Sequence, residues 1–421
     1  MKSGGKIPKH WLKKRNQSGT HPIHDLSSQQ EMTDSPTVDW SGLPPELLLT
    51  VAANLQTLAD YIRFRAACQN WRAAAPLIPR YLPREFPWLM LPLIRTSGRR
   101  GFLSPLTNDL HRLTFPEASL GRRRAGSSFG WLVLIDESPS VFLINPLTRD
   151  RVALPPLNSF PNVMRFDFYS IGREYTVRSP ENDLYYCNLK EMRDTFVKKV
   201  VLSHSPYGNS DFFALAILNR HENLAYCKNG DDSWKIIDAA RSYSEDVIYL
   251  NGAFYALNKF GSIAICDLKD EDLPVVKFIT VRQQIDGDMQ YLVDAMGDLL
   301  LVSRYLEFDI DLDHYSEVCK TSKFRVFRFD WTSQIWVSTA SLDDKVLFLG
   351  TNSSLALLAS DYPGCRGNRI YFTDDYSGMS YDVMGGDQDV GVYSLCDGTI
   401  EQFPCYPRNS HWPIWIMPSL C

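Results

Sequence analysis

Apolar positions recur at helical spacing near the N-terminus of the 421-residue chain. A first stripe, which fits one face of a helix, consists of Leu47, Leu48, Val51 and Leu55. We expect this helix to begin at the Pro44-Pro45 pair, because proline suits the first turn, where a backbone N–H has no intrahelical partner. Glu46 adds a negative charge at the positive end of the helix dipole.

Two more short helices are predicted before Pro76. Thr57, with Asp60 three positions later, can form a capping box for the second helix. Asn70 can cap a third helix, which carries Trp71. Three helices in about 40 residues bury too little surface to be stable alone. Another surface, in this chain or in a partner, must therefore cover part of their apolar face.

From Gly130 onwards the pattern changes to short apolar runs separated by turn residues, which is typical of β-strands. The clearest hairpin joins 246–250 to 253–257 through Asn251-Gly252, the residue pair that best tolerates the positive φ values of a type I′ turn. Other pairs of expected strands are 131–135 with 141–145, 324–329 with 335–338, and 391–395 with 399–402. No helix of three turns is predicted in this part.

An all-β stretch of this size must protect its sheet edges, and radial repetition into a propeller does so. A rough repeat consists of a hydrophobic strand, a polar turn, a strand that ends in Asn or Asp, and a short exit strand; it is visible around 142–152, 264–276 and 326–336. At about 50 residues per kelch-like blade, the length predicts roughly six blades. Two packed sheets in a sandwich are the alternative.

The domain organisation follows from these patterns. We expect a polar, disordered tail over 1–38, a helical domain over 39–80, a linker that leads into the propeller over 81–125, and the propeller itself over 126–421. The fold class is multidomain α plus all-β. The tail contains a loose basic cluster, Lys9, Lys13, Lys14 and Arg15, which is either a nuclear import signal or a solvated segment.

Composition narrows the function classes. The formal net charge of -5 argues against a nucleic-acid partner, because such surfaces are basic. The chain has no apolar run of about 18 residues and no apolar signal core, so we expect neither a membrane span nor secretion. Nine cysteines, without a Cys-x-x-Cys pair, fit reduced thiols. The expected location is the cytoplasm, the nucleus or both.

The N-terminal segment resembles an F-box. The matching residues occur in the order and spacing of that family, and they are Leu43-Pro44, Glu46-Leu47-Leu48, Arg63-Phe64-Arg65 and Cys68-x-x-Trp71-Arg72. The chain departs from the pattern at Ala67, where valine is common, and at the small Ala52-Ala53 pair. Without the resemblance, a helical hairpin packed onto its own C-terminal domain would explain the same periodicity.

The resemblance implies that the F-box lays its apolar face against helices of a Skp-type adaptor, which links it to cullin and RING subunits. The expected adaptor-binding residues are Leu43, Pro44, Pro45, Leu47, Leu48, Val51, Leu55, Cys68 and Trp71. Truncation of central interface anchors of this kind commonly costs about 2 kcal/mol or more, so two or three of them suffice for stable recruitment.

The resemblance extends to the whole chain, which is similar to the plant F-box proteins with a C-terminal kelch-like propeller, the KIB group. The landmarks are the segments 126–132, 142–148, 368–375, 389–395 and 413–415. It implies a plant source and a substrate-recognition subunit of an SCF ubiquitin ligase, neither of which composition shows. The target protein and the residues that bind it are unknown. The alternative is a protein that binds or sequesters a partner, such as a protein kinase, outside the ligase.

Apparent catalytic patterns do not hold. The segment 126–130 satisfies Gly-x-Ser-x-Gly around Ser128, but a nucleophile elbow lies between a strand and a helix, whereas here a basic loop precedes the serine and a strand follows it. Asp374 and Asp375 suggest paired carboxylates, yet adjacent strand residues point to opposite faces. We therefore expect no catalytic residue, and a propeller hydrolase is the least favoured alternative.

Charged clusters in the β-rich part also have simpler explanations than a binding site. Asp309, Asp311, Asp313 and Glu317 imitate a calcium loop, but His314 occupies the position where the sharp turn requires glycine. The run 122–124 of three arginines can meet a phosphate or an acidic partner, although a charged loop between strands is the default interpretation. We therefore predict no metal and no cofactor.

Overall fold

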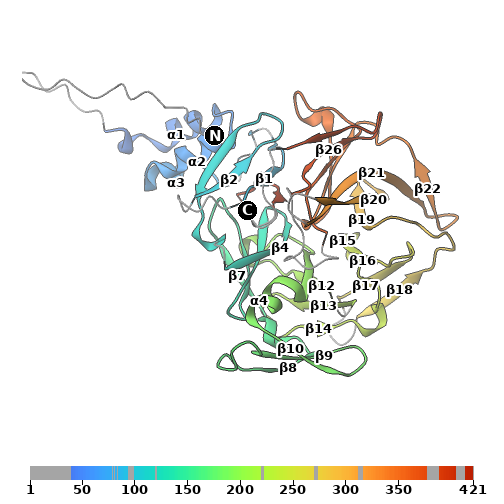
Figure 1. Cartoon of the computed structure of the whole chain (residues 1–421). Coiled ribbons are helices and arrows are strands. Elements are labelled where there is room, and N and C mark those ends of the chain that lie inside the picture. Colours follow the sequence, from blue (N-terminus) through green and yellow to red (C-terminus); the bar gives the residue numbers. More distant parts are fainter. Residues whose placement is uncertain are drawn as a thin grey trace, which may run out of the picture.

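The structure, a computed structural model of the chain, describes residues 39–77, 79, 81–82, 84–92, 99–118, 121–219, 222–269, 274–311, 316–376, 388–403 and 413–420. A small helical module is followed by a ring of β-sheets (Figure 1). The basic cluster of the N-terminal tail lies outside the described residues. The calcium-like pattern lies partly outside them as well, because residues 312–315 are not among those described.

The helical module has the three predicted helices, preceded by a short 3-10 turn. They are η1 (Trp40–Gly42), α1 (Pro45–Ala53), α2 (Leu58–Ala66) and α3 (Gln69–Ala74). Thr57 caps α2 as predicted, because its side chain accepts a hydrogen bond from the backbone N–H of Asp60 at 3.1 Å. The prediction for Asn70 is wrong: α3 begins at Gln69, with Cys68, two residues before Asn70, at the N-cap position, and the Asn70 amide instead donates to the Ser41 carbonyl at 3.0 Å.

Six sheets form the blades of the propeller. The first comprises β1 (Trp88–Met90), β2 (Arg99–Leu103), β3 (Leu110–Thr114) and the C-terminal β28 (Ile414–Ile416); the second, β4 (Arg122–Ser128), β5 (Trp131–Asp136), β6 (Val141–Ile144) and β7 (Arg151–Leu154); the third, β11 (Val197–Leu202), β12 (Phe213–Leu218), β13 (Asn223–Lys228) and β14 (Lys235–Ile236). The fourth comprises β15 (Asp246–Leu250), β16 (Ala253–Leu257), β17 (Ile263–Asp267) and β18 (Val275–Ile279); the fifth, β19 (Met289–Ala295), β20 (Asp298–Asp311), β21 (Ser316–Asp330) and β22 (Ile335–Thr339); the sixth, β23 (Lys345–Leu349), β24 (Leu355–Leu358), β25 (Arg369–Phe372), β26 (Gly391–Ser394) and β27 (Ile400–Gln402).

A seventh, three-stranded sheet lies outside the ring. It consists of β8 (Val163–Phe166), β9 (Tyr175–Arg178) and β10 (Leu184–Cys187), and Figure 1 shows it at the periphery. The order of the inner strands excludes it as a blade, because β4 of the second blade contacts β11 of the third directly. A short helical segment, α4 (Leu189–Glu191) with η4 (Met192–Phe196), then leads into β11.

The hydrophobic core is divided among the contacts between neighbouring blades. Each of six buried clusters in the described residues draws side chains from two adjacent blades, and the cluster between the second and third blades also includes residues of the three-stranded sheet. The ring closes where Phe348 of the sixth blade packs edge-to-face against Trp415 of the first, with ring centroids 5.2 Å apart. The predicted count of roughly six blades is therefore confirmed.

The propeller begins earlier than the sequence predicted. The segment 81–125, expected to be a linker, contains β1, β2, β3 and the start of β4, so the ring begins at Trp88 rather than at 126. The first blade is completed by β28, whose Trp415 pairs with Leu89 across the sheet. A three-residue strand whose partner lies at the other end of the chain leaves no local periodic signal.

The hairpin at Asn251-Gly252 is confirmed, with φ values of 49° and 86°. The arginine run 122–124, expected in a loop, lies instead in the inner strand β4. Arg122 forms a 2.6 Å ion pair with Asp136, and Arg123 donates to carbonyls at the start of β11. Among the described helices, none has the length and hydropathy that a membrane span requires.

Candidate binding surfaces

The first helix of the module presents a short apolar stripe to solvent. The side chains of Leu47 and Val51 are 53% and 45% exposed, and Pro44 at the start of the helix is also exposed. These positions are three and four residues apart, so they lie on one side of the helix. The described part of the chain leaves this side uncovered.

Leu48 does not belong to that exposed surface, although the sequence placed it in the same stripe. It is 1% exposed and packs with Ala52, Tyr61 and Phe64 in the core of the module. The reason is geometric: successive helical residues differ by about 100°, so Leu48 and Ala52 face inward while Leu47 and Val51 face outward. Leu48 therefore supports the helix and is not available for contact.

The other predicted adaptor-binding residues fall between these extremes. Pro45 is exposed, whereas Leu43, Leu55, Cys68 and Trp71 are half-buried. The Trp71 ring packs on Phe64 with centroids 4.6 Å apart, and its indole N–H donates to the Trp40 carbonyl at 2.9 Å. Trp71 thus holds α3 against α2 and η1, and only part of its ring remains accessible.

The module is seated on its own propeller through the opposite side. Leu420, from the C-terminal end of the chain, and Leu147, from the turn after β6, pack against its core. The backbone N–H of Leu58 donates to the Glu85 carboxylate at 3.1 Å, and burial raises the pKa of Glu85. The propeller therefore supplies the covering surface that three short helices need.

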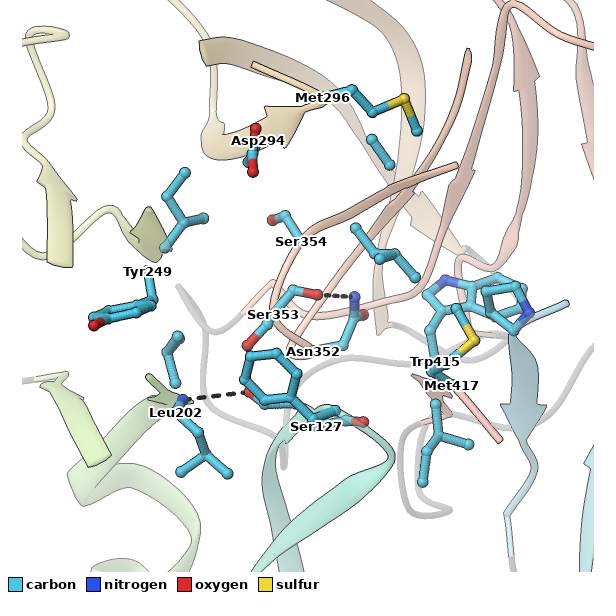
Figure 2. Close-up of a pocket in the computed structure, with 18 residues that line it drawn as sticks. Ser127, Leu202, Tyr249, Asp294, Met296, Asn352, Ser353, Ser354, Trp415 and Met417 are labelled. Carbon is cyan, nitrogen blue, oxygen red and sulfur yellow. Dashed lines mark hydrogen bonds between the residues drawn. The ribbon is translucent and has the colours of Figure 1, made fainter. Parts of the chain in front are cut away.

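The propeller carries a pocket on its axis. The pocket encloses about 380 Å³, and its walls are the carboxyl-terminal ends of β4, β11, β15, β19 and β28 together with the connection between β23 and β24. Every blade contributes lining residues, so the pocket lies where the inner strands of the ring come together (Figure 2). We call it the central pocket.

Most of the central pocket is apolar. Leu202, Ile248, Met417 and other hydrophobic side chains form its walls, and a serine-rich segment, 352–354, lines one side. Among the described residues that line it, Asp294 is the only charged one. The pocket can therefore hold an apolar group and offer it a few polar contacts.

No direct sign of this pocket is visible in the sequence, because its walls meet only when the ring closes. One local signal was present. Phe129-Gly130 and Met296-Gly297 occupy the same kind of turn as Asn251-Gly252, with a large hydrophobic residue where asparagine is usual. Both Phe129 and Met296 line the central pocket.

The residues that imitate catalytic patterns have partners of their own. The Ser128 hydroxyl lies 2.5 Å from the Ser353 hydroxyl, and β4 leads into a tight turn and a further strand rather than a helix. The Asp375 carboxylate accepts from Tyr291 at 2.8 Å and from Arg304 at 3.0 Å, and the Asp374 carboxylate accepts from the backbone of the segment before β26. These contacts join neighbouring parts of the propeller.

Buried ion pairs connect the inner strands. The Lys199 ammonium lies 2.7 Å from the Asp246 carboxylate, and both side chains are buried. The second Asp246 oxygen accepts from the Leu292 backbone at 3.0 Å and from the Ser354 hydroxyl at 3.3 Å, so one carboxylate links four blades. In β4, burial and the nearby Arg100 charge lower the pKa of Arg124.

Comparison with known proteins agrees with this architecture. The chain is similar to the F-box protein SKIP23 of Arabidopsis thaliana, with 29% identity over 89% of this chain and 94% of that protein. It is also similar to the putative F-box protein At5g55150 of the same plant, with 26% identity over 91% of this chain and 98% of that protein. Among solved structures, the chain is weakly similar to YCF48 from Cyanidioschyzon merolae, with 10% identity and a TM-score of 0.24 over 55% of this chain and 74% of that chain.

The family comparison covers most of the ring. The sequence model of the KIB1-4 beta-propeller family matches residues 102–394, from β2 to β26. This range includes the second to fifth blades completely and parts of the first and sixth, whose strands β1, β27 and β28 lie outside it. The chain therefore belongs to the KIB1-4 β-propeller family.

Proposed function

We propose that this protein is the substrate-recognition subunit of an SCF ubiquitin ligase. In this role the helical module binds a Skp-type adaptor, which connects it to cullin and RING subunits, and the propeller holds a target protein. The observation that carries the proposal is the exposed stripe of Pro44, Leu47 and Val51 on a module whose opposite side is already seated on the propeller. The relatives named F-box proteins support it.

The expected binding energy follows from the exposed area. Complete burial of a leucine is worth roughly 1.5–3 kcal/mol. Since Leu47 is 53% exposed, covering the rest of its side chain contributes about half of that, and Val51 at 45% adds a comparable amount. Central anchors cost about 2 kcal/mol or more on truncation, because partner groups are also left unpaired. Loss of either side chain should therefore weaken adaptor binding by about tenfold or more.

The proposal assigns ubiquitin transfer to other subunits. The patterns that imitate active sites, around Ser128 and Asp375, are occupied by hydrogen bonds within the propeller. A propeller provides a rigid scaffold on which loops can recognise a partner. The chain thus acts by binding the adaptor through the helical module and the target through the propeller. The packing of the module against the ring fixes the distance between these two sites.

The experiment is co-purification of the full chain with the Skp-type adaptor and cullin. Leu47→Ala and Val51→Ala should reduce the recovered adaptor, since both remove part of the exposed stripe. The matched control is Leu49→Ala: Leu49 is a 43% exposed leucine of the same helix, but it lies on another side. Equal recovery from all three variants and the wild type would contradict the proposal.

A second measurement separates a ligase receptor from a protein that only sequesters its partner. Proteins labelled by proximity to the full chain are quantified with and without a proteasome inhibitor. A ligase target should accumulate on inhibition, and it should accumulate in cells without the inhibitor when the Leu47→Ala variant replaces the wild type. Target levels that respond to neither change would favour sequestration outside the ligase.

A further inference from the structure

Two buried polar atoms in the wall of the central pocket have no hydrogen-bond partner among the described residues. They are the indole N–H of Trp415 and the carboxamide oxygen of Asn352. The side chains are 2% and 3% exposed, so the protein has removed both groups from bulk water. An unpaired buried donor or acceptor costs free energy, and each one calls for an explanation.

The surrounding contacts fix both groups in place. The Asn352 amide nitrogen donates to the Phe348 carbonyl at 3.2 Å and to the Ser353 carbonyl at 2.9 Å, which leaves the oxygen as the group still to be satisfied. The Trp415 ring is held edge-to-face against Phe348. Figure 2 shows Asn352 and Trp415 on the wall of the same pocket. Both atoms have almost no accessible surface, so they lie behind the wall of the pocket, and an occupant reaches them only where that wall shifts.

The rim of the pocket carries a second, independent sign of a partner. Phe129 and Met296 have φ values of 51° and 62°, in the left-handed region that large side chains rarely adopt. Both side chains are about half exposed, at 49% and 51%. At the equivalent turn of the fourth blade, Asn251 takes the same conformation without this strain. The rim thus displays two large apolar groups against both backbone preference and the hydrophobic effect.

These features indicate what kind of ligand the central pocket binds. The volume of about 380 Å³ is at the lower end for small-molecule pockets, and a ligand confined to it would leave the Phe129 and Met296 side chains in water. A polypeptide segment covers both: one side chain fills the pocket while its neighbours lie on the rim.

We propose that the central pocket binds an extended segment of the target protein and takes one large apolar side chain, such as leucine, methionine or phenylalanine. Because Asp294 is the only charged lining residue among those described, basic residues next to this anchor are favoured over acidic ones. The inference rests on the receptor role proposed above and names where the target is held.

The position of the pocket suits that role. Pro87, which lines the pocket, directly follows the segment whose Glu85 holds Leu58 of the module. Met417, also a lining residue, precedes Leu420, which packs in the core of the module. Both connections between the module and the ring therefore pass the pocket, so a segment bound there lies on the side of the disc that faces the module's attachment.

The test uses a library of random 12-residue peptides displayed on phage and selected on the purified full chain. The account expects enrichment of sequences with one large apolar residue flanked by neutral or basic ones. Affinities of selected, fluorescently labelled peptides are then measured for Phe129→Asn and Met296→Asn. Each should weaken binding by roughly tenfold, the scale of one lost anchor, while thermal stability is kept or raised because asparagine suits the turn.

One further variant keeps the test specific. Phe260→Asn, at a 57% exposed phenylalanine that does not line the pocket, should change nothing. Absence of apolar-anchored sequences, or equal affinity for wild type and rim variants, would overturn the inference. Binding of the wild-type chain to the Skp-type adaptor is measured in parallel. Failure to bind the adaptor would overturn the receptor role, whereas the result of the peptide selection would stand.

Discussion

The buried arginine between the fifth and sixth blades gives a sharp test of how the ring is held together. Arg304 is 1% exposed, and its guanidinium lies 2.8 Å from Asp389 and 3.0 Å from Asp375. It also donates to the Thr373 carbonyl at 2.8 Å and to the Thr321 hydroxyl at 2.8 Å. These contacts join β20 to the two ends of the segment that connects β25 and β26.

Replacement of Arg304 by methionine keeps most of the side-chain volume and removes the charge. Asp389, which is 3% exposed, and Asp375 would then be buried carboxylates without their cation. Removal of one partner from a buried ion pair costs about 3–5 kcal/mol. The matched control is Arg325→Met, because Arg325 is 53% exposed and its nearest carboxylate is 3.9 Å away. An exposed pair of this kind is worth about 1 kcal/mol or less.

The effect should depend on pH in a defined direction. Burial raises the pKa of Asp375, and the Arg304 charge opposes that rise. Without Arg304, the folded-state pKa should move further above the unfolded value. A carboxyl with a raised folded-state pKa favours the folded state at low pH, and this contribution is lost as the pH rises through that pKa. The variant's deficit should therefore be smaller at pH 5 than at pH 7.5.

The assay is equilibrium urea denaturation of both variants and the wild type, followed by tryptophan fluorescence at the two pH values. The expected result is a loss of about 3–5 kcal/mol in the free energy of unfolding for Arg304→Met at pH 7.5 and little change for Arg325→Met. Equal, small losses for both variants would refute the reasoning, as would a deficit that grows on acidification.

Two other substitutions test local packing. Leu48→Ala should lower the stability of the helical module by about 2–5 kcal/mol, seen as faster amide hydrogen exchange in α1, because it empties a fully buried site; protection equal to that of Leu47→Ala would contradict the assigned faces. Gly130→Ala should lower the thermal midpoint more than Gly172→Ala. Both glycines have a φ of 82°, so the backbone strain is the same. The new Cβ at 130 would lie 2.6 Å from the Ser419 Cβ, whereas the new Cβ at 172 meets nothing within 4 Å. Equal decreases in the thermal midpoint would contradict this reasoning, because the C-terminal segment would then move away from the new Cβ without loss of stability.

Local chemistry in the sequence predicted local structure well. The Thr57 cap, the proline start of α1 and the Asn251-Gly252 hairpin are all confirmed, because each depends on residues a few positions apart. Periodicity was less informative about burial. It groups Leu47 and Leu48 in one stripe, but it does not say which side of that stripe the propeller will cover.

Features that depend on distant parts of the chain were missed. The strand β1 has only three residues, and its longer pairing is with β28, at the other end of the sequence. The arginines of β4 looked like a charged loop, yet Arg123 is held by carbonyls of β11, more than seventy positions away. The central pocket is the extreme case, since six inner strands have to meet before it exists.

The most direct test of the central claim is the affinity of the purified full chain for the Skp-type adaptor, measured by isothermal titration calorimetry. The account predicts saturable one-to-one binding by the wild type. It predicts an affinity lower by about tenfold or more when Leu47 and Val51 are both replaced by alanine, and an unchanged affinity for Leu49→Ala. No binding by the wild type, or the same affinity for all three proteins, would contradict it.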